Sequence, residues 1–310
     1  MNAVELDHVC FTYSRNMPGA VPALDDVSLS VKSGGITGLI GHTGSGKSTL
    51  VQLLNGLLKP DSGTVLLDGH DIWAEPKKIR EIRFKAGLVM QYPEYQLFAE
   101  TVAEDIAFGP KNMGIGGEEL DARVKEAARF AGIGEELLGK SPFDLSGGQK
   151  RRAALAGVIA MNPKILILDE PAAGLDPAGR RDILGGVKRF SRESGTTVII
   201  VSHSMEDMAM YCDDVIVMAR AKILMHRPTA EVFSEAEQLA SVGLDVPLVT
   251  RVAAALGELG VDIGRDVYTV DYAVGKILEH IGAAPVNFEN VKDAAGKNGT
   301  GAAGKAGAEH

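Results

Sequence analysis

The stretch Ile36-Thr-Gly-Leu-Ile40-Gly41-His-Thr-Gly-Ser-Gly46-Lys47-Ser48 joins an apolar run to a glycine-rich loop that ends in lysine and serine. The loop fits the pattern GxxxxGK[ST], and the spacing predicts a strand over 36–40 before it and a helix over 48–58 after it. Glycines let backbone N–H groups converge on phosphates, and the helix N-terminus adds partial positive charge. We therefore predict a phosphate-binding loop in which Lys47 reaches the β- and γ-phosphates of a nucleotide and Ser48 ligates Mg²⁺.

A second apolar run, Ile165-Leu-Ile-Leu-Asp169-Glu170, ends in two carboxylates. A buried parallel strand would place Asp169 at its carboxyl end, beside the Mg²⁺, because ligands bind there in open α/β sheets. Glu170 would then orient or deprotonate the attacking water. A strand that ends in two carboxylates is common on its own, so this interpretation depends on the phosphate-binding loop.

The motif Leu145-Ser146-Gly147-Gly148-Gln149 distinguishes this sequence from other P-loop enzymes. Ser146 can cap the helix that follows, and the two glycines permit close backbone approach to an anion. With this motif the sequence resembles the ATP-binding cassette (ABC) proteins over residues 1 to about 235. In that family the signature motif of one subunit closes over the γ-phosphate held by another. One copy of each motif therefore implies half of a dimeric ATPase.

Further positions match the motifs of the family in their usual order. Tyr13 matches the aromatic residue that stacks on adenine, with a place in the core as the alternative. Gln91 matches the glutamine that senses Mg²⁺ and the water, and His203 matches the histidine that contacts the γ-phosphate; a lone histidine at a strand end is more often structural. Gly174-Leu-Asp-Pro177 resembles the loop that crosses the dimer interface. Ala172 stands where the family more often has Thr or Ser, and the catalytic roles do not depend on it.

The resemblance implies ATP and Mg²⁺ as cofactors and three sets of site residues. The catalytic set is Glu170, His203 and Gln91, and the metal set is Ser48, Gln91 and Asp169. The ATP-binding set comprises Tyr13, Gly41, His42, Thr43, Gly44, Ser45, Gly46, Lys47, Ser48, Thr49, Ser146, Gly147, Gly148 and Gln149.

Alternating strand-like and helical segments predict an α/β fold with a mostly parallel sheet. The resemblance implies the P-loop NTPase fold of ABC ATPases, with an antiparallel β portion, a helical insert subdomain and a small C-terminal helical extension. We expect a nucleotide-binding domain over 1–238 with the insert at about 92–160, and the extension over 239–291. The Gly/Ala/Lys-rich residues 292–310 are expected to be a disordered tail.

Within the family, the sequence resembles the ATPase subunits of energy-coupling factor transporters, which import vitamins and transition-metal ions in prokaryotes. The stretches that carry this resemblance are residues 91–98, 101–110, 140–152 and 243–247. Tyr92-Pro93-Glu94 and residues 140–143 are more similar to the second of the two paired ATPases. An ATPase used as a homodimer in a cobalt or nickel importer is the alternative.

This resemblance also implies partners. They are a second ABC ATPase subunit, in a hetero- or homodimer, a membrane scaffold (T) subunit and, indirectly, a substrate-binding membrane (S) subunit. A coupling helix of the scaffold is expected to enter a groove lined by Tyr95, Leu97 and Phe98, although these side chains have packing inside the insert as their alternative. The run Lys150-Arg151-Arg152 either touches a partner or forms a solvated helix face.

Composition limits the remaining possibilities. The formal net charge of -9 makes nucleic acid an unexpected partner, and the chain lacks a polybasic lipid anchor. No apolar run approaches the ~18 residues of a membrane span, so we expect a peripheral protein on the cytoplasmic face of the cell membrane. The two cysteines fit a reduced compartment. A soluble, non-transport ABC ATPase and a regulator that does not hydrolyse ATP remain as alternatives, and the sequence does not reveal the transported solute.

Overall fold

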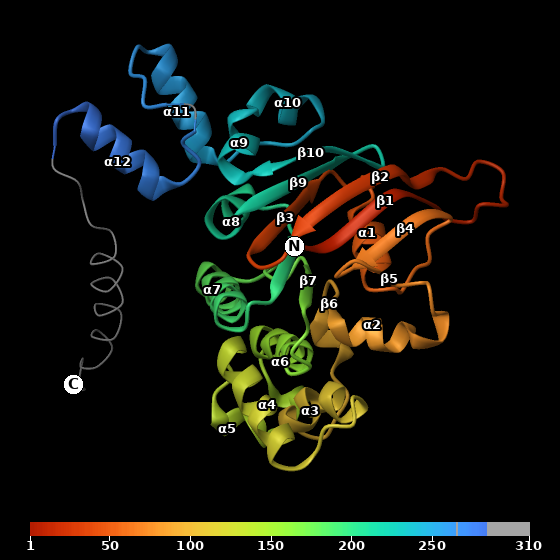
Figure 1. The fold of residues 1–310 in the computed structure, drawn as a ribbon. Helices are drawn as coiled ribbons and strands as arrows, with labels where there is room; N and C mark the ends of the chain where they lie inside the picture. The colour runs from red at the N-terminus through yellow and green to blue at the C-terminus, as the bar shows by residue number, and fades with distance from the viewer. Residues whose placement is uncertain (265, 284–310) are drawn as a thin grey trace, which may run out of the picture. The chain divides into compact units, whose positions relative to one another are not determined.

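The computed structural model describes residues 1–264 and 266–283. One compact unit comprises Met1–Asp245, and a second begins at Val246. Figure 1 shows the fold of each unit. The domain limits predicted from the sequence, 1–238 and 239–291, stay predictions, and the predicted tail 292–310 lies outside the described residues.

A six-stranded sheet forms the centre of the first unit. Its strands are β3 (Ile36–Gly41), β6 (Ala86–Val89), β7 (Ile165–Asp169), β8 (Thr197–Val201), β9 (Asp214–Ala219) and β10 (Lys222–Pro228). Their order is β10-β9-β3-β8-β7-β6, and only the pairing of β10 with β9 is antiparallel. β8 is buried along its whole length and β7 up to Leu168, as expected for parallel strands that are covered on both faces.

A second, antiparallel sheet packs against the same core. Its strands are β1 (Asn2–Thr12), β2 (Pro22–Lys32), β4 (Ser62–Leu67) and β5 (His70–Asp71), in the order β2-β1-β4-β5. Along β2, buried residues alternate with exposed ones, and the buried face shares one hydrophobic core with the parallel sheet. The predicted α/β class, with a mostly parallel sheet and an antiparallel portion, is confirmed.

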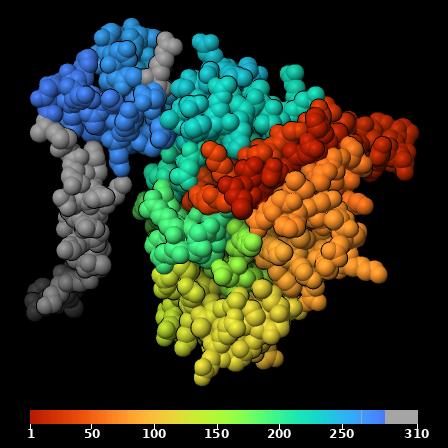
Figure 2. Space-filling view, in the orientation of Figure 1, coloured from red at the N-terminus to blue at the C-terminus, as the bar shows by residue number. Residues whose placement is uncertain are grey.

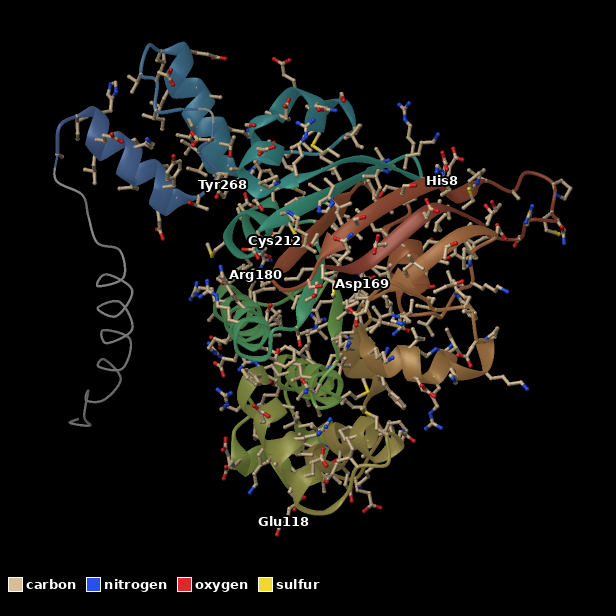
Figure 3. All side chains as sticks on the ribbon, in the orientation of Figure 1. His8, Glu118, Asp169, Arg180, Cys212 and Tyr268 are labelled. Carbon is tan, nitrogen blue, oxygen red and sulfur yellow. The ribbon has the colours of Figure 1, made fainter. Side chains whose placement is uncertain are left out.

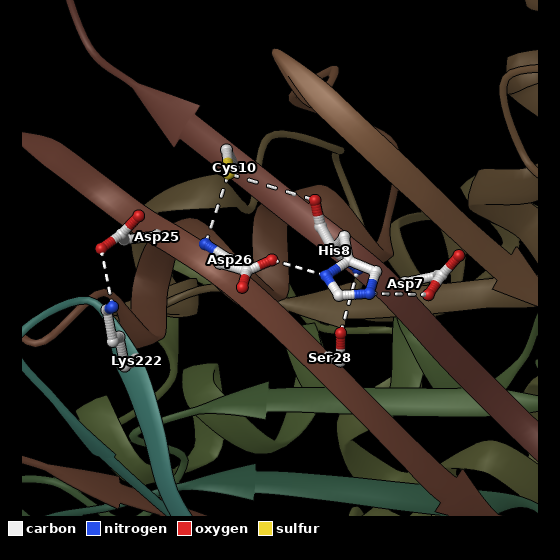
Figure 4. A network of polar contacts seen from close by, with 7 residues as sticks. All are labelled: Asp7, His8, Cys10, Asp25, Asp26, Ser28 and Lys222. Atoms are coloured by element: carbon white, nitrogen blue, oxygen red, sulfur yellow. Dashed lines mark hydrogen bonds and ion pairs between the residues drawn. The ribbon is translucent and has the colours of Figure 1, made fainter.

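Polar contacts hold the exposed side of β1 and β2 together and link it to the other sheet (Figure 4). His8 Nδ1 lies 2.6 Å from Asp26 Oδ1, and the N–H of Asp26 donates to Cys10 Sγ at 3.3 Å. The hydrogen bond to Asp26 raises the pKa of His8. Lys222 of β10 pairs with Asp25 of β2 at 3.0 Å, so this network bridges the two sheets.

The helix after the glycine-rich loop, α1 (Lys47–Leu54), is shorter than the predicted helix over 48–58, so that prediction is wrong at its C-terminal end. Asn55 caps it, and Gly56 has a φ of 70°, a left-handed conformation that ends a helix and favours glycine. The short elements η1 (Pro76–Lys78) and α2 (Ile79–Lys85), which follow β5, were not predicted.

Short helices form a subdomain between β6 and β7. They are η2 (Pro93–Gln96), α3 (Val102–Asn112), α4 (Gly117–Ala131), α5 (Glu135–Leu138), η3 (Pro142–Asp144) and α6 (Gly147–Ile159). Figures 1 and 2 show the yellow to yellow-green segment with these helices gathered at one end of the first unit. A capping box between Thr101 and Glu104 fixes the start of α3.

The first unit also contains α7 (Pro177–Ser194), α8 (Met205–Tyr211), α9 (Thr229–Ser234) and α10 (Ala236–Ser241). α7 packs on α4 through an edge-to-face pair of Phe130 and Phe190, whose ring centroids are 5.2 Å apart. In the second unit, α11 (Leu248–Glu258) and α12 (Val270–His280) share a small core that includes Ala253 and Val267. Within residues 1–264 and 266–283, every helix is too short or too polar to cross a membrane.

Candidate functional site

A cavity of about 540 Å³ lies at the carboxyl ends of β3, β7 and β8, and this volume falls within the usual range for small-molecule sites. Figure 3 labels Asp169 at the end of β7. The residues that line the cavity are Tyr13, Val21, Pro22, Ala23, Thr43, Gly44, Gly46, Lys47, Ser48, Thr49, Gln91, Asp169, Glu170, Val201 and His203. The carboxyl edge of a parallel sheet is where α/β proteins bind their ligands.

Most of the predicted site residues therefore meet in one cavity. Gly41, His42 and Ser45 belong to the glycine-rich loop but do not line the cavity. The predicted residues 146–149 also lie outside it. The lining segment Val21-Pro22-Ala23 was missed, because these residues carry no motif and reach the cavity only through the path of the chain into β2.

The glycine-rich loop is shaped by its backbone and closed by its lysine. Gly46 has a φ of 106°, and a Cβ at this position would collide with the carbonyl oxygen of Ala23. Lys47 Nζ donates to the carbonyl oxygens of Gly41 at 2.7 Å and His42 at 3.1 Å. Burial lowers the pKa of Lys47, and the charge of Glu170 opposes this shift. The loop thus holds a partly desolvated ammonium group at the cavity.

Glu170 is in a strained backbone conformation at the end of β7. Its φ is 52°, a left-handed value that costs about 1–3 kcal/mol in a non-glycine residue. Its N–H donates to the carbonyl of Val201 at 3.0 Å. Its Oε1 is buried without a hydrogen-bond donor, 3.5 Å from His203 Nε2. This acceptor is free to bind a ligand or a water.

Burial controls the charges of the acidic pair. It raises the pKa of Glu170 to about 7, and the neighbouring charge of Asp169 adds to the shift. Burial also raises the pKa of Asp169, against the opposing charge of Lys47. A cation placed between the two carboxylates would reverse both shifts, because it stabilises the charged forms.

These shifts predict a pH-dependent effect of Glu170→Gln on stability. The pKa of Glu170 in the folded protein lies above the ordinary value of 4.5, so the stability linked to its proton is complete below pH 4.5 and is lost as pH rises through about 7. Without nucleotide or Mg²⁺, the variant is therefore expected to gain up to about 3 kcal/mol at pH 8, but less than about 1 kcal/mol at pH 5.

Urea unfolding in EDTA at the two pH values measures this difference. Glu100→Gln, a change at an exposed glutamate, is the matched control and should alter neither value. An equal gain at pH 5 and pH 8 would contradict the assigned environment of Glu170.

A polar cluster beside His203 was not predicted. Arg180 Nη1, at the start of α7, lies 3.4 Å from Asp207 Oδ2 and 3.4 Å from Ser204 Oγ. Figure 3 labels Arg180. Ser204 also caps α8 by accepting the N–H of Asp207. The cluster connects the loop that carries His203 to α7. It could not be predicted, because no local sequence pattern indicates an ion pair between residues on different helices.

Tyr13 lies at the rim of the cavity. It is 48% exposed, so the alternative of a core position is wrong. Its hydroxyl is 3.2 Å from Thr49 Oγ1, and its ring meets Phe11 edge to face. These contacts hold an aromatic side chain at the cavity with much of its surface accessible.

The predicted cap at Ser146 is confirmed. Its Oγ accepts the N–H of Gln149 at 3.3 Å, and Gln149 Oε1 accepts the N–H of Ser146 at 2.9 Å. This capping box starts α6 and occupies the side chain of Gln149. Both alternatives for Arg151 are wrong, because this residue is buried and pairs with Glu94.

Comparison with known proteins identifies the family. A family model described as ABC transporter matches residues 24–173, and a model for an AAA domain matches residues 140–208. The energy-coupling factor transporter ATP-binding protein EcfA2 of Clostridium acetobutylicum is 49% identical over 282 residues, which are 91% of this chain and 99% of that protein. EcfA2 of Caldanaerobacter subterraneus is 50% identical over 90% of this chain and 97% of its own. The chain belongs to the energy-coupling factor ATPases of the ABC family.

Solved structures resemble this energy-coupling factor ATPase closely. The cbiO1 protein of Clostridium perfringens, part of the ABC transporter complex cbiONQ, is 37% identical with a TM-score of 0.71 over 84% of this chain and 98% of its own. A dimeric ATP-binding cassette, MJ0796 bound to ADP and Pi, is 28% identical with a TM-score of 0.66 over 73% of this chain and 98% of its own. The predicted family and ABC ATPase fold are confirmed, and these matches do not favour the alternative functions.

Proposed function

We propose that this energy-coupling factor ATPase hydrolyses Mg-ATP at composite sites formed with a second ABC ATPase subunit, and that hydrolysis drives uptake of a vitamin or transition-metal ion through membrane subunits. One observation carries the proposal. The cavity gathers Lys47, Asp169, Glu170 and His203, whereas the signature motif at 146–149 lies outside it. A signature motif that does not line the cavity of its own chain is available to the nucleotide of another subunit.

Each wall of the cavity suits one part of ATP. The accessible ring of Tyr13 would stack on adenine, and Lys47 with the N–H groups of its loop would bind the phosphates. The unpartnered Oε1 of Glu170 would accept a proton from the attacking water. His203 and Gln91 would complete the γ-phosphate end of the site.

The acceptors in the cavity also fit Mg²⁺. In the described part of the chain, no group of three or more His, Cys, Asp or Glu side chains is arranged to hold a metal ion. Mg²⁺ usually takes one or two carboxylates together with substrate phosphates, so Asp169, Ser48 and Gln91 suffice as its protein ligands. When bound, Mg²⁺ supplies neutralisation of the charge that develops on the phosphate oxygens.

We also propose that residues 92–98, called the docking segment, receive a coupling helix of the scaffold (T) subunit. Tyr95 is 85% and Phe98 60% exposed, so packing inside the insert does not account for them, whereas Leu97 is half-buried. Phe98 stacks edge to face on Phe108, whose side chain is also exposed. Exposed clustered aromatics are typical of interaction sites. This docking would hold the protein at the cytoplasmic face of the membrane, with the S subunit reached indirectly.

Changing both Tyr95 and Phe98 to Ser is therefore expected to release the protein from membranes that contain the scaffold and a sister ATPase. The loss of two aromatic anchors should reduce the membrane-bound fraction by about tenfold or more. Membrane flotation after co-expression measures this fraction, and ATP binding should be unchanged.

Met210→Ser removes an exposed apolar side chain on α8 and is the matched control. The wild-type complex should be extractable in detergent and should turn over ATP faster than the isolated subunit. Retention of the double variant on membranes would place the docking surface elsewhere, and an unstimulated wild-type complex would contradict the proposed function.

A further inference from the structure

Arg151 forms a buried junction inside the helical subdomain. Its side chain is 6% exposed, and the side chain of its partner Glu94 is 17% exposed. Arg151 Nε and Nη2 donate to the two carboxylate oxygens of Glu94 at 3.1 Å and 2.9 Å. Nη1 donates to the carbonyl oxygen of Ala173. One guanidinium group thus binds two segments that are distant in sequence from α6.

These segments have different places in the proposed ATPase cycle. Glu94 belongs to the docking segment, directly before Tyr95 and two residues before Gln96, where η2 ends. Ala173 lies in the turn after Glu170, and its N–H donates to the carbonyl of Glu170 at 3.2 Å. Arg151 itself lies in the second turn of α6, which begins at the signature motif. The junction therefore touches the docking segment, the signature helix and the turn that follows Glu170.

Only an arginine can make this set of contacts. Its planar guanidinium presents a two-pronged donor to a carboxylate and keeps a further N–H for a carbonyl oxygen. A lysine at the same place would offer a compact charge without this fixed geometry. A buried ion pair is weak support for stability alone, since apolar residues often replace such pairs without loss. The geometry of Arg151 instead fixes the relative positions of three backbone segments.

We infer that Arg151 is a positioning residue that couples the docking segment to the ATP site through Glu94 and Ala173. The inference rests on the proposed function, because it requires a membrane partner at residues 92–98. A shift of the docking segment would move Glu94. The rigid, planar guanidinium group of Arg151 would transmit this shift to α6 and to the turn after Glu170. Docking would thereby adjust both the signature motif and the catalytic carboxylate.

Three variants of the full complex test the coupling: Arg151→Met, Glu94→Gln and the two changes combined. The double variant leaves no unpaired buried charge, so it remains informative where a single variant folds poorly. Arg123→Met, which breaks an exposed ion pair with Glu119 in α4, is the matched control. The measurements are ATP affinity of the subunit, recovery of the assembled complex, and kcat and KM for ATP with and without the membrane subunits.

We expect the three junction variants to bind ATP like the wild type, with KM changed by less than about twofold. Arg151→Met, whose change lies outside the docking segment, should also assemble like the wild type. The kcat of all three variants in the complex should fall by about tenfold or more, within the range of typical coupling between sites. The kcat of the double variant should fall no further than that of either single variant, because all three variants break the same junction. Arg151→Lys should retain part of the stimulation that Arg151→Met loses, since a lysine keeps the positive charge but lacks the planar two-pronged donor.

Three outcomes would overturn the inference. If the membrane subunits stimulate the kcat of the double variant as fully as that of the wild type, the junction is only a structural ion pair. A lower melting temperature with unchanged kcat per assembled complex would do the same. Loss of assembly with intact ATP binding would show that Arg151 only maintains the docking surface. Absence of stimulation in the wild-type complex is a separate result, because it contradicts the proposed function and not the junction.

Discussion

Replacing Glu170 with Gln is expected to lower ATP turnover of the assembled complex by about 10²-fold or more, the usual contribution of a general base. The amide preserves the shape of the side chain but cannot take a proton from the attacking water. Because Glu170 is not proposed to bind the phosphates, ATP affinity should change little. Phosphate release and equilibrium ATP binding, measured on the same preparation, check both statements.

The composite site adds a second readout for this variant. With hydrolysis blocked, ATP should stay bound between two subunits, so the variant should accumulate as an ATP-dependent dimer in size-exclusion chromatography. Glu100→Gln, at an exposed position, should behave like the wild type. Turnover close to the wild-type rate in a homogeneous complex would rule out the assigned role of Glu170. A strict monomer that hydrolyses ATP at the full rate would rule out the composite site.

Lys47→Ala is expected to weaken ATP binding itself. The ammonium group is buried in the loop and held by the carbonyls of Gly41 and His42, so the variant loses both a charge near the phosphates and a clamp on the loop. In a partly desolvated site this charge should contribute about 2–3 kcal/mol, which corresponds to a dissociation constant raised roughly 30- to 150-fold. Titration with a fluorescent ATP analogue measures the change.

Lys77→Ala removes an exposed lysine from η1 and controls for the loss of one positive charge from the protein. Its ATP affinity should equal that of the wild type. An unchanged dissociation constant for Lys47→Ala would show that this lysine does not contact the phosphates. A comparable loss in both variants would mean that the overall charge, not the position of Lys47, determines affinity.

The sequence predicted the central strands because their chemistry is local. Ile165–Leu168 and Val198–Val201 are unbroken apolar runs, and such runs have few alternatives to a strand buried on both faces. The prediction for the helix over 48–58 was wrong at its end, because Gly56 ends α1 by a left-handed turn that the apolar spacing of the leucines does not reveal.

The glycine-rich loop, the acidic strand end and the signature motif could be predicted from the sequence for the same reason. Each is a contiguous motif whose backbone conformation and hydrogen bonds are made by neighbours in sequence, as the capping box of Ser146 and Gln149 illustrates. Since parallel strands present their carboxyl ends at one edge, the glycine-rich loop and the acidic strand end were expected to meet, and Lys47, Asp169 and Glu170 do line one cavity.

The sequence by itself thus determined the family, the fold class and most of the polar residues that line the candidate site. Only the tertiary structure decided which charged groups are buried and with whom they pair. In the sequence, Arg151 is one of three consecutive basic residues of a predicted helix. In the structure, packing of η2 against α6 buries Arg151 and pairs it with Glu94, which is 57 residues away in the sequence. The orphaned Oε1 of Glu170 and the Arg180–Asp207 pair arise in the same way. Burial and long-range pairing depend on how all elements pack together, so no local pattern in the sequence encodes them.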